Sequence, residues 1–249
     1  MSDRVSGIIS FGLTTQSLER LGHFYEDLGF TAGPSERIPS HETALLGLTG
    51  GGTRLPLWLG KACVTLDCFD ERGREYPADA SAAYLCFQHF ALVTSDAAAA
   101  WERALKSGAT AISKHGPVTL PESAGGVTAC KFRDPEGHPL QLLQFPAATQ
   151  MKWQGDGMLG IDHSAISVSD AAASERFYVA LGLSVRSTTL NQGEAQAALD
   201  GLPKPIVQVV AMLPPQAPPH LELLAYRVPL GLSAGPVRAN DVAGTPTVW

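Results

Sequence analysis

The sequence lacks the features that mark several large classes of protein. Its four cysteines, at positions 63, 68, 86 and 130, form no Cys-x-x-Cys pair, so neither a disulfide framework nor a structural zinc knuckle is expected. No apolar run reaches the ~18 residues that a membrane-spanning helix needs. The first residues contain no apolar core like that of a secretion signal. These absences favour a protein of the reducing cytoplasm.

Positive charge is also scarce. There are 18 Lys and Arg residues against 24 Asp and Glu, which gives a net charge of −6, and no basic stripe occurs. A nucleic-acid partner is therefore not expected, because binding to phosphates needs concentrated Lys and Arg. The remaining composition, 45% hydrophobic and 17% charged over 249 residues, is that of a globular protein long enough for two domains.

What the sequence does contain is an internal repeat. In each of three copies a residue that can cap a helix precedes a glycine by twelve residues: Ser17 and Gly29, Asp96 and Gly108, Asp170 and Gly182. Ser and Asp side chains accept hydrogen bonds from the first turn of a helix, and glycine tolerates the left-handed conformation that ends one. The spacing leaves room for about three helical turns. We therefore predict three equivalent helices, each preceded by a short strand.

Each predicted helix is followed by strand and turn signals. The clearest is the turn Asp134-Pro135-Glu136-Gly137, which leads into an apolar strand over 140–145. The corresponding strands of the first and third copies are 64–69 and 220–226. Each copy is thus predicted to contain a strand, a helix and about three more strands. His138, directly after the turn, is expected on the surface.

At these motifs the sequence resembles the vicinal-oxygen-chelate superfamily, which includes glyoxalases, extradiol dioxygenases and bleomycin-resistance proteins. The resemblance is carried by the opening strand at His163, by Phe177-Tyr178 with the following Leu-Gly-Leu, by Phe24-Tyr25 in the first copy, and by the turn at 134–137. It covers most of residues 6–227. It implies an α+β fold of βαβββ modules whose mixed, curled sheets form an open barrel around a cavity. The chemistry stays open, since isomerases, lyases, oxygenases and binding proteins share this fold.

The resemblance also predicts how the chain is divided. Modules over 6–72 and 85–147 are expected to form a first barrel, followed by a linker at 148–160 and a third module at 161–227. The tail, 228–249, resembles the remnant of a fourth module. A third module alone would expose a concave apolar face, and we expect a second copy of the chain to cover it in a homodimer.

In the superfamily, the opening and closing strands of each module supply metal ligands. Carried over to this sequence, those positions are Ser10 and Thr65, His89 and Gln141, and His163 and Glu222. Because Ser10 and Thr65 are poor ligands, we expect the first barrel to bind no metal. His89 and Gln141 are then expected to line its cavity as ligand-binding polar residues.

The third module is better equipped for a metal. Glu222 lies between leucines, and a buried carboxylate needs a cation or strong donors. We predict that His163 and Glu222 bind a divalent Fe, Mn, Ni, Co or Zn ion, completed by the same residues of a second copy, with Glu222 also the catalytic base. The alternative is that the two side chains pair with each other or with solvent. Strand alternation places His220 on the face of Glu222, in a supporting position.

Two functions remain open at this stage. One is a metal-dependent, glyoxalase-like lyase, isomerase or dioxygenase that acts on a small oxygenated molecule. The other is a metal-independent protein that binds or sequesters a small molecule, as bleomycin-resistance proteins do. A third hypothesis is that the chain is a truncated relative of these proteins that lost its function together with the fourth module. Loops at 37–41, 117–126 and 191–198 are expected to shape the cavity.

Overall fold

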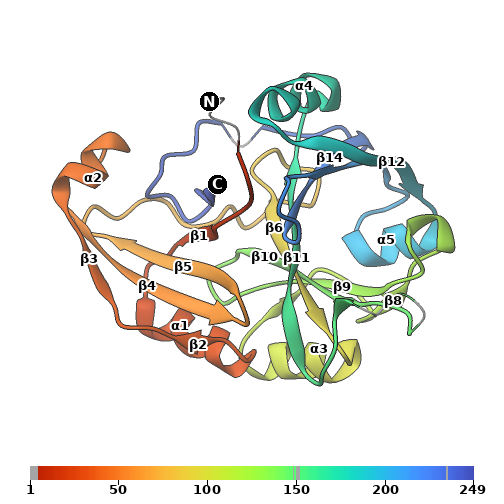
Figure 1. The fold of residues 1–249 in the computed structure, drawn as a ribbon, viewed down its shortest axis with the longest axis horizontal. Coiled ribbons are helices and arrows are strands. Elements are labelled where there is room, and N and C mark those ends of the chain that lie inside the picture. The colour runs from red at the N-terminus through yellow and green to blue at the C-terminus, as the bar shows by residue number, and fades with distance from the viewer. Residues whose placement is uncertain (1–4, 148, 150–151, 234) are drawn as a thin grey trace.

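The computed structural model describes residues 5–147, 149, 152–233 and 235–249. A six-stranded and a nine-stranded sheet, both mixed and both open, form its framework (Figure 1). The predicted α+β fold is confirmed. Among the described residues, no helix is both long and apolar enough to cross a membrane.

Three modules follow one another along the chain. The first contains β1 (Ser10–Thr14), α1 (Leu18–Asp27), β2 (Thr31–Ala32), β3 (Glu36–Ile38), α2 (Ser40–Leu45), β4 (Gly52–Leu59) and β5 (Ala62–Phe69). The second contains β6 (Gln88–Thr94), α3 (Ala97–Lys106), β7 (Thr110–Ala111), β8 (Val118–Thr119), a 3₁₀ helix (Glu122–Ala124), β9 (Thr128–Arg133) and β10 (Pro139–Gln144). The third contains β11 (Met158–Ser167), α4 (Ala171–Leu181), β12 (Ser184–Gln192), α5 (Glu194–Asp200), β13 (Ile206–Leu213) and β14 (His220–Val228), and β15 (Thr247–Val248) follows it.

The three predicted helices begin and end where the repeat places them. Each cap side chain accepts a hydrogen bond from the backbone N–H three residues later: Ser17 from Arg20, Asp96 from Ala99 and Asp170 from Ala173. The three glycines have positive φ angles of 101°, 101° and 112° in chain order. Local capping chemistry therefore accounts for these boundaries.

The modules pair differently from the prediction. The opening strands of modules two and three, β6 and β11, run antiparallel side by side, so these two modules share the nine-stranded sheet. Module one forms the other sheet. The sequence predicts that modules one and two form the first barrel, whereas the shared sheet joins modules two and three. Module three therefore has a partner within the same chain, and the two modules line one cavity together. The homodimer stays a prediction.

Modules one and two meet through their helices instead. Helix α1 contacts α3, and both bury apolar side chains in one large core that includes Phe24, Tyr25, Trp101 and Phe132. Figure 1 shows α1 and α3 along the same side of the molecule, with α4 on the opposite side. Burial of two amphipathic helices against each other explains why module one joins module two without sharing its sheet.

The tail returns to module one. Strand β15 pairs antiparallel with β1, Val248 opposite Ser10, and so lies beside β1 as β11 lies beside β6. The interpretation of the tail as the remnant of a fourth module stays a prediction. The predicted linker at 148–160 falls partly outside the described residues, and β11 already begins at Met158.

His138 is not on the surface as expected. Its side chain is 0% exposed and joins modules two and one, with Nδ1 2.7 Å from Asp134 Oδ2 and Nε2 3.0 Å from the backbone oxygen of Thr14. Each ring nitrogen of His138 therefore faces an oxygen acceptor. Both nitrogens can donate an N–H only when the ring is protonated, so this arrangement favours the imidazolium form. Burial opposes that charge, but Asp134 outweighs it and raises the pKa of His138.

This raised pKa predicts a pH-dependent stability. An unfolded histidine titrates near pH ~6.5. The contribution of His138 to the free energy of unfolding is therefore complete below that pH and is lost as the pH rises through the higher folded-state pKa. Urea unfolding of the native chain and of His138→Gln, between about pH 6 and pH 9, should give a stability difference that shrinks with rising pH. A constant difference would show that His138 is neutral in the folded chain.

Candidate functional site

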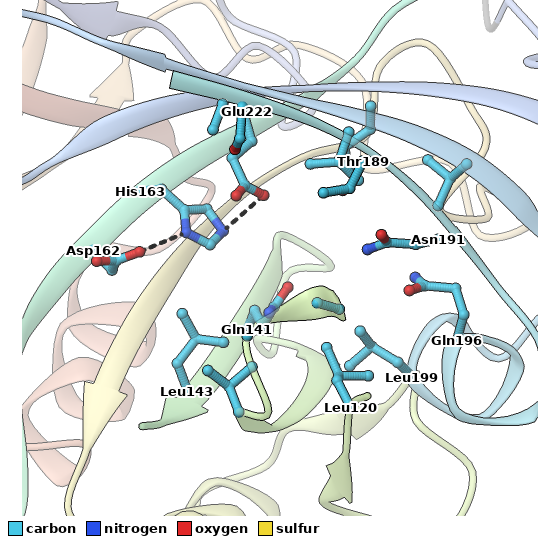
Figure 2. A pocket seen from close by; sticks show the side chains of 18 of the residues that line it. Leu120, Gln141, Leu143, Asp162, His163, Thr189, Asn191, Gln196, Leu199 and Glu222 are labelled. Atoms are coloured by element: carbon cyan, nitrogen blue, oxygen red, sulfur yellow. Dashed lines mark hydrogen bonds and ion pairs between the residues drawn. The ribbon is translucent and has the colours of Figure 1, made fainter. Parts of the chain in front are cut away.

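The nine-stranded sheet curls around a cavity of about 400 Å³ (Figure 2). Two of the three predicted loop regions contribute to its lining, with Leu120 from 117–126 and with Asn191 and Gln196 from 191–198. The second of these regions forms the end of β12 and most of α5 rather than a loop. No residue of 37–41 is among the described lining residues.

Four residues predicted for two separate sites line this one cavity: His89 on β6, Gln141 on β10, His163 on β11 and Glu222 on β14. The strand register explains why. Residues directly opposite each other in a sheet project from the same face. Ala165 lies between His89 and Glu222, and Ala91 lies between Gln141 and His163.

Both alanines are fully buried, and their small side chains leave the space above the sheet to the four functional groups. The structure therefore brings four polar side chains together within a single chain, whereas His163 and Glu222 were expected to be completed by the same residues of a second copy. Ser10 and Thr65, the corresponding positions of module one, belong to the other sheet.

The two ring nitrogens of His163 have different surroundings. Nδ1 lies 3.0 Å from Asp162 Oδ2, at hydrogen-bond distance. Nε2 lies 3.6 Å from Glu222 Oε2, too far for an ordinary hydrogen bond. Figure 2 shows the imidazole between the two carboxylates. An N–H donated to Asp162 directs the lone pair of Nε2 into the cavity.

His89 is a buried residue of this cavity. Within the described part of the chain, neither of its ring nitrogens has a hydrogen-bond partner, and Nε2 of His163 has none either. The two imidazole rings are neighbours, with centroids 5.9 Å apart. Most buried polar atoms are hydrogen-bonded, so three such nitrogens facing one cavity mark a place built for a ligand. A cation would satisfy Nε2 of His163 and the ring nitrogen of His89 that bears the lone pair, while the N–H at the other His89 nitrogen calls for an acceptor.

The charges of the cluster suit a cation. Burial lowers the pKa of His89 well below its usual value, so its imidazole is neutral and keeps a free lone pair. Burial alone would raise the pKa of the Glu222 carboxyl. Attraction to the neighbouring His163 and His220 has the larger effect and lowers that pKa to about 2. Burial alone would lower the pKa of His163. The negative charges of Glu222 and Asp162 outweigh burial, so the pKa of His163 is raised.

Two further residues complete the cluster. His220, expected on the face of Glu222, has Nε2 3.7 Å from Glu222 Oε1 and Nδ1 3.8 Å from Asp162 Oδ2. Ligand-capable atoms of Asp162, His163 and His220 lie within 4.8 Å of one another, which offers a second arrangement for an ion. Sequence reasoning missed Asp162, because a register shift next to His163 re-aims its side chain, as bulges do.

The sequence matches no protein-family model and no curated protein. Solved structures do match. Glyoxalase I from Zea mays has a TM-score of 0.59 at 15% identity, over 92% of this chain and 69% of that one. Two point mutants of that enzyme have TM-scores of 0.61 and 0.59 at 15% and 16% identity, over 91% and 98% of this chain and 69% and 73% of theirs. The fold is therefore similar to that of these glyoxalase I structures, as the resemblance predicted. At such identity the likeness shows the fold and not the reaction.

Proposed function

We propose that this chain is a metal-dependent, glyoxalase-like enzyme, a lyase, isomerase or dioxygenase that acts on a small oxygenated molecule. His89, Gln141, His163 and Glu222 are the proposed metal ligands. The observation that carries the proposal is the set of unpartnered, buried imidazole nitrogens that face the same cavity as an ionised Glu222. The four cysteines are free thiols, which fits the cytoplasmic location that we also propose.

The donor set fits a divalent transition metal. Two imidazoles, one carboxylate and one amide suit Fe, Mn, Ni, Co or Zn. Asp162, as acceptor for the Nδ1–H of His163, is the kind of outer partner that fixes the tautomer and orientation of a histidine ligand. Once bound, such an ion would act as a Lewis acid on an oxygen of the substrate.

The side chains of the cavity have complementary tasks. Glu222 has one oxygen 3.6 Å from His163 and the other 3.7 Å from His220, so a proton accepted by the carboxylate has a neighbouring imidazole to receive it. Leu120, Leu143 and Leu199 form an apolar wall of the cavity. By excluding water, this wall strengthens electrostatic interactions with a bound molecule.

A metal-independent binding protein is the second candidate. The observation in its favour is that two carboxylates and two histidines already contact one another, at 3.0 to 3.8 Å. Such a cluster can balance its own charge with protons alone. The cavity would then hold a small molecule without an ion.

A Co(II) titration followed by visible absorption separates the two candidates. We expect new absorption bands that stop growing at one Co(II) per chain, with binding strongly weakened in the double variant His89→Ala/Gln141→Ala. His41→Ala, which removes an exposed histidine of module one, is the matched control and should titrate like the native chain. Failure of the native chain to bind Co(II), Zn(II), Ni(II), Mn(II) or Fe(II) would refute the proposed enzyme and leave the binding protein.

A further inference from the structure

A buried lysine lies on the same concave face as the four proposed ligands. Lys131 of β9 is directly opposite Gln141 in the sheet, and it lines the cavity. Its Nζ lies 2.7 Å from Asp200 Oδ1 on α5, and the two side chains are 4% and 0% exposed. It is the sole Lys or Arg among the described lining residues.

The buried carboxylate of Asp200 holds several polar side chains of the cavity wall in place. It accepts three hydrogen bonds, from Lys131 Nζ at 2.7 Å, from Gln196 Nε2 at 2.7 Å and from the Tyr226 hydroxyl at 2.9 Å. The three donors line the cavity, so one buried carboxylate fixes three polar side chains around it. In Figure 2, Gln196 lies across the cavity from His163 and Asp162, with Asn191 beside it.

Lys131 has donors to spare. An ammonium group carries three N–H bonds, and within the described residues only the one to Asp200 is used. The other close group is the ring of Phe87, with its centroid 5.9 Å from Nζ. A buried charge with unmatched donors is costly, and an oxygen acceptor in the cavity would remove that cost.

A purely structural role explains Lys131 less well. The ion pair does link β9 to α5 across the open side of the curled sheet. However, Ser113 already makes that link, since its hydroxyl donates to the backbone oxygen of Leu199 at 2.7 Å and accepts from the backbone N–H of Lys131 at 2.8 Å. Neither of these bonds needs a lysine side chain.

We infer that the molecule bound in this cavity is a small oxygenated carboxylic acid, whose carboxylate is bound by Lys131. The inference rests on the proposed function for the four ligands of the same cavity, where a second oxygen of the molecule would meet the ion. One lysine matches the single charge of a carboxylate, and the leucines that line the cavity suit a short carbon chain. Lys131 is thus a residue that determines specificity.

Hydroxamates test this inference, because they chelate transition metals through two oxygens and can carry a second group. On the full chain loaded with Zn(II), calorimetry would compare acetohydroxamate with the monohydroxamates of malonic, succinic and glutaric acid. The best of the three acids should bind at least about tenfold more tightly than acetohydroxamate, as expected for a hydrogen bond between charged groups. In Lys131→Met this preference should disappear, whereas loss of a structural tie would weaken all four compounds alike.

Two variants keep the test decisive if Lys131→Met does not fold. Asp200→Asn retains the lysine and removes its counter-charge, so the preference for the acid should rise. Arg54→Met breaks an ion pair of the same 2.7 Å length, with Asp67, in the other sheet, and should leave the preference unchanged.

The outcomes separate this inference from the proposed function. If acetohydroxamate binds but no acid binds more tightly, or if the preference survives in Lys131→Met or stays unchanged in Asp200→Asn, the inference is wrong and the metal site stands. If Zn(II) itself does not bind, the proposed function fails and the inference falls with it.

Discussion

Replacing His163 with alanine is expected to lower the affinity of the chain for Zn(II) by more than about a hundredfold, because loss of an outer partner alone typically costs 10–100-fold. His163 supplies the buried Nε2 that has no hydrogen-bond partner in the described chain. It also holds Glu222 and Asp162 on either side of it. Competition with a chelator of known affinity measures the effect, and circular dichroism checks that the variant folds.

Two further variants test which residues bind the ion. Asp162→Asn removes the acceptor that orients His163 and should cost about 10–100-fold. His220→Ala leaves all four proposed ligands in place and should cost less than either. If His220→Ala costs as much as His163→Ala, the ion is held by the alternative trio of Asp162, His163 and His220, and the ligand set proposed above is wrong.

Replacing Phe24 with alanine should destabilise the chain by about 3–5 kcal/mol, the usual cost of removing a buried aromatic side chain. Phe24 is 2% exposed, and its ring lies 5.4 Å from that of Tyr25 and 6.5 Å from that of Phe132. It belongs to the core that joins modules one and two. Urea unfolding at neutral pH is the measurement.

The repeat supplies the matched control. Phe177 occupies the same place in module three, seven residues after the cap, yet it is 59% exposed on α4. Phe177→Ala should therefore change the free energy of unfolding by no more than about 0.5 kcal/mol. Similar losses for the two variants would contradict the packing described here, and would mean that α4 is covered in solution.

This pair of phenylalanines also shows where sequence reasoning reaches its limit. Caps, glycines and strand alternation are local, so the sequence was enough to predict the three helices. His89, Gln141, His163 and Glu222 were named from the family resemblance, and their roles stay a prediction. Identical spacing in every copy, however, carries no information on which modules share a sheet. That choice depends on long-range burial, such as α1 against α3.

The same limit explains the residues that sequence reasoning missed. Lys131 and Asp200 are 69 residues apart and on different modules, so nothing in the local pattern joins them. His138 was expected on the surface because it follows a turn, yet its partner Thr14 lies 124 residues away. Both contacts become visible only once the modules are assembled.

We propose that one chain alone builds the metal site. Native mass spectrometry of the Zn(II)-loaded protein at low concentration reports ion content and assembly together. We expect one ion on each 26.3 kDa chain, retained by the monomer. A metal-free monomer, with one ion held only between two chains, would contradict the claim and return the site to the interface of a dimer.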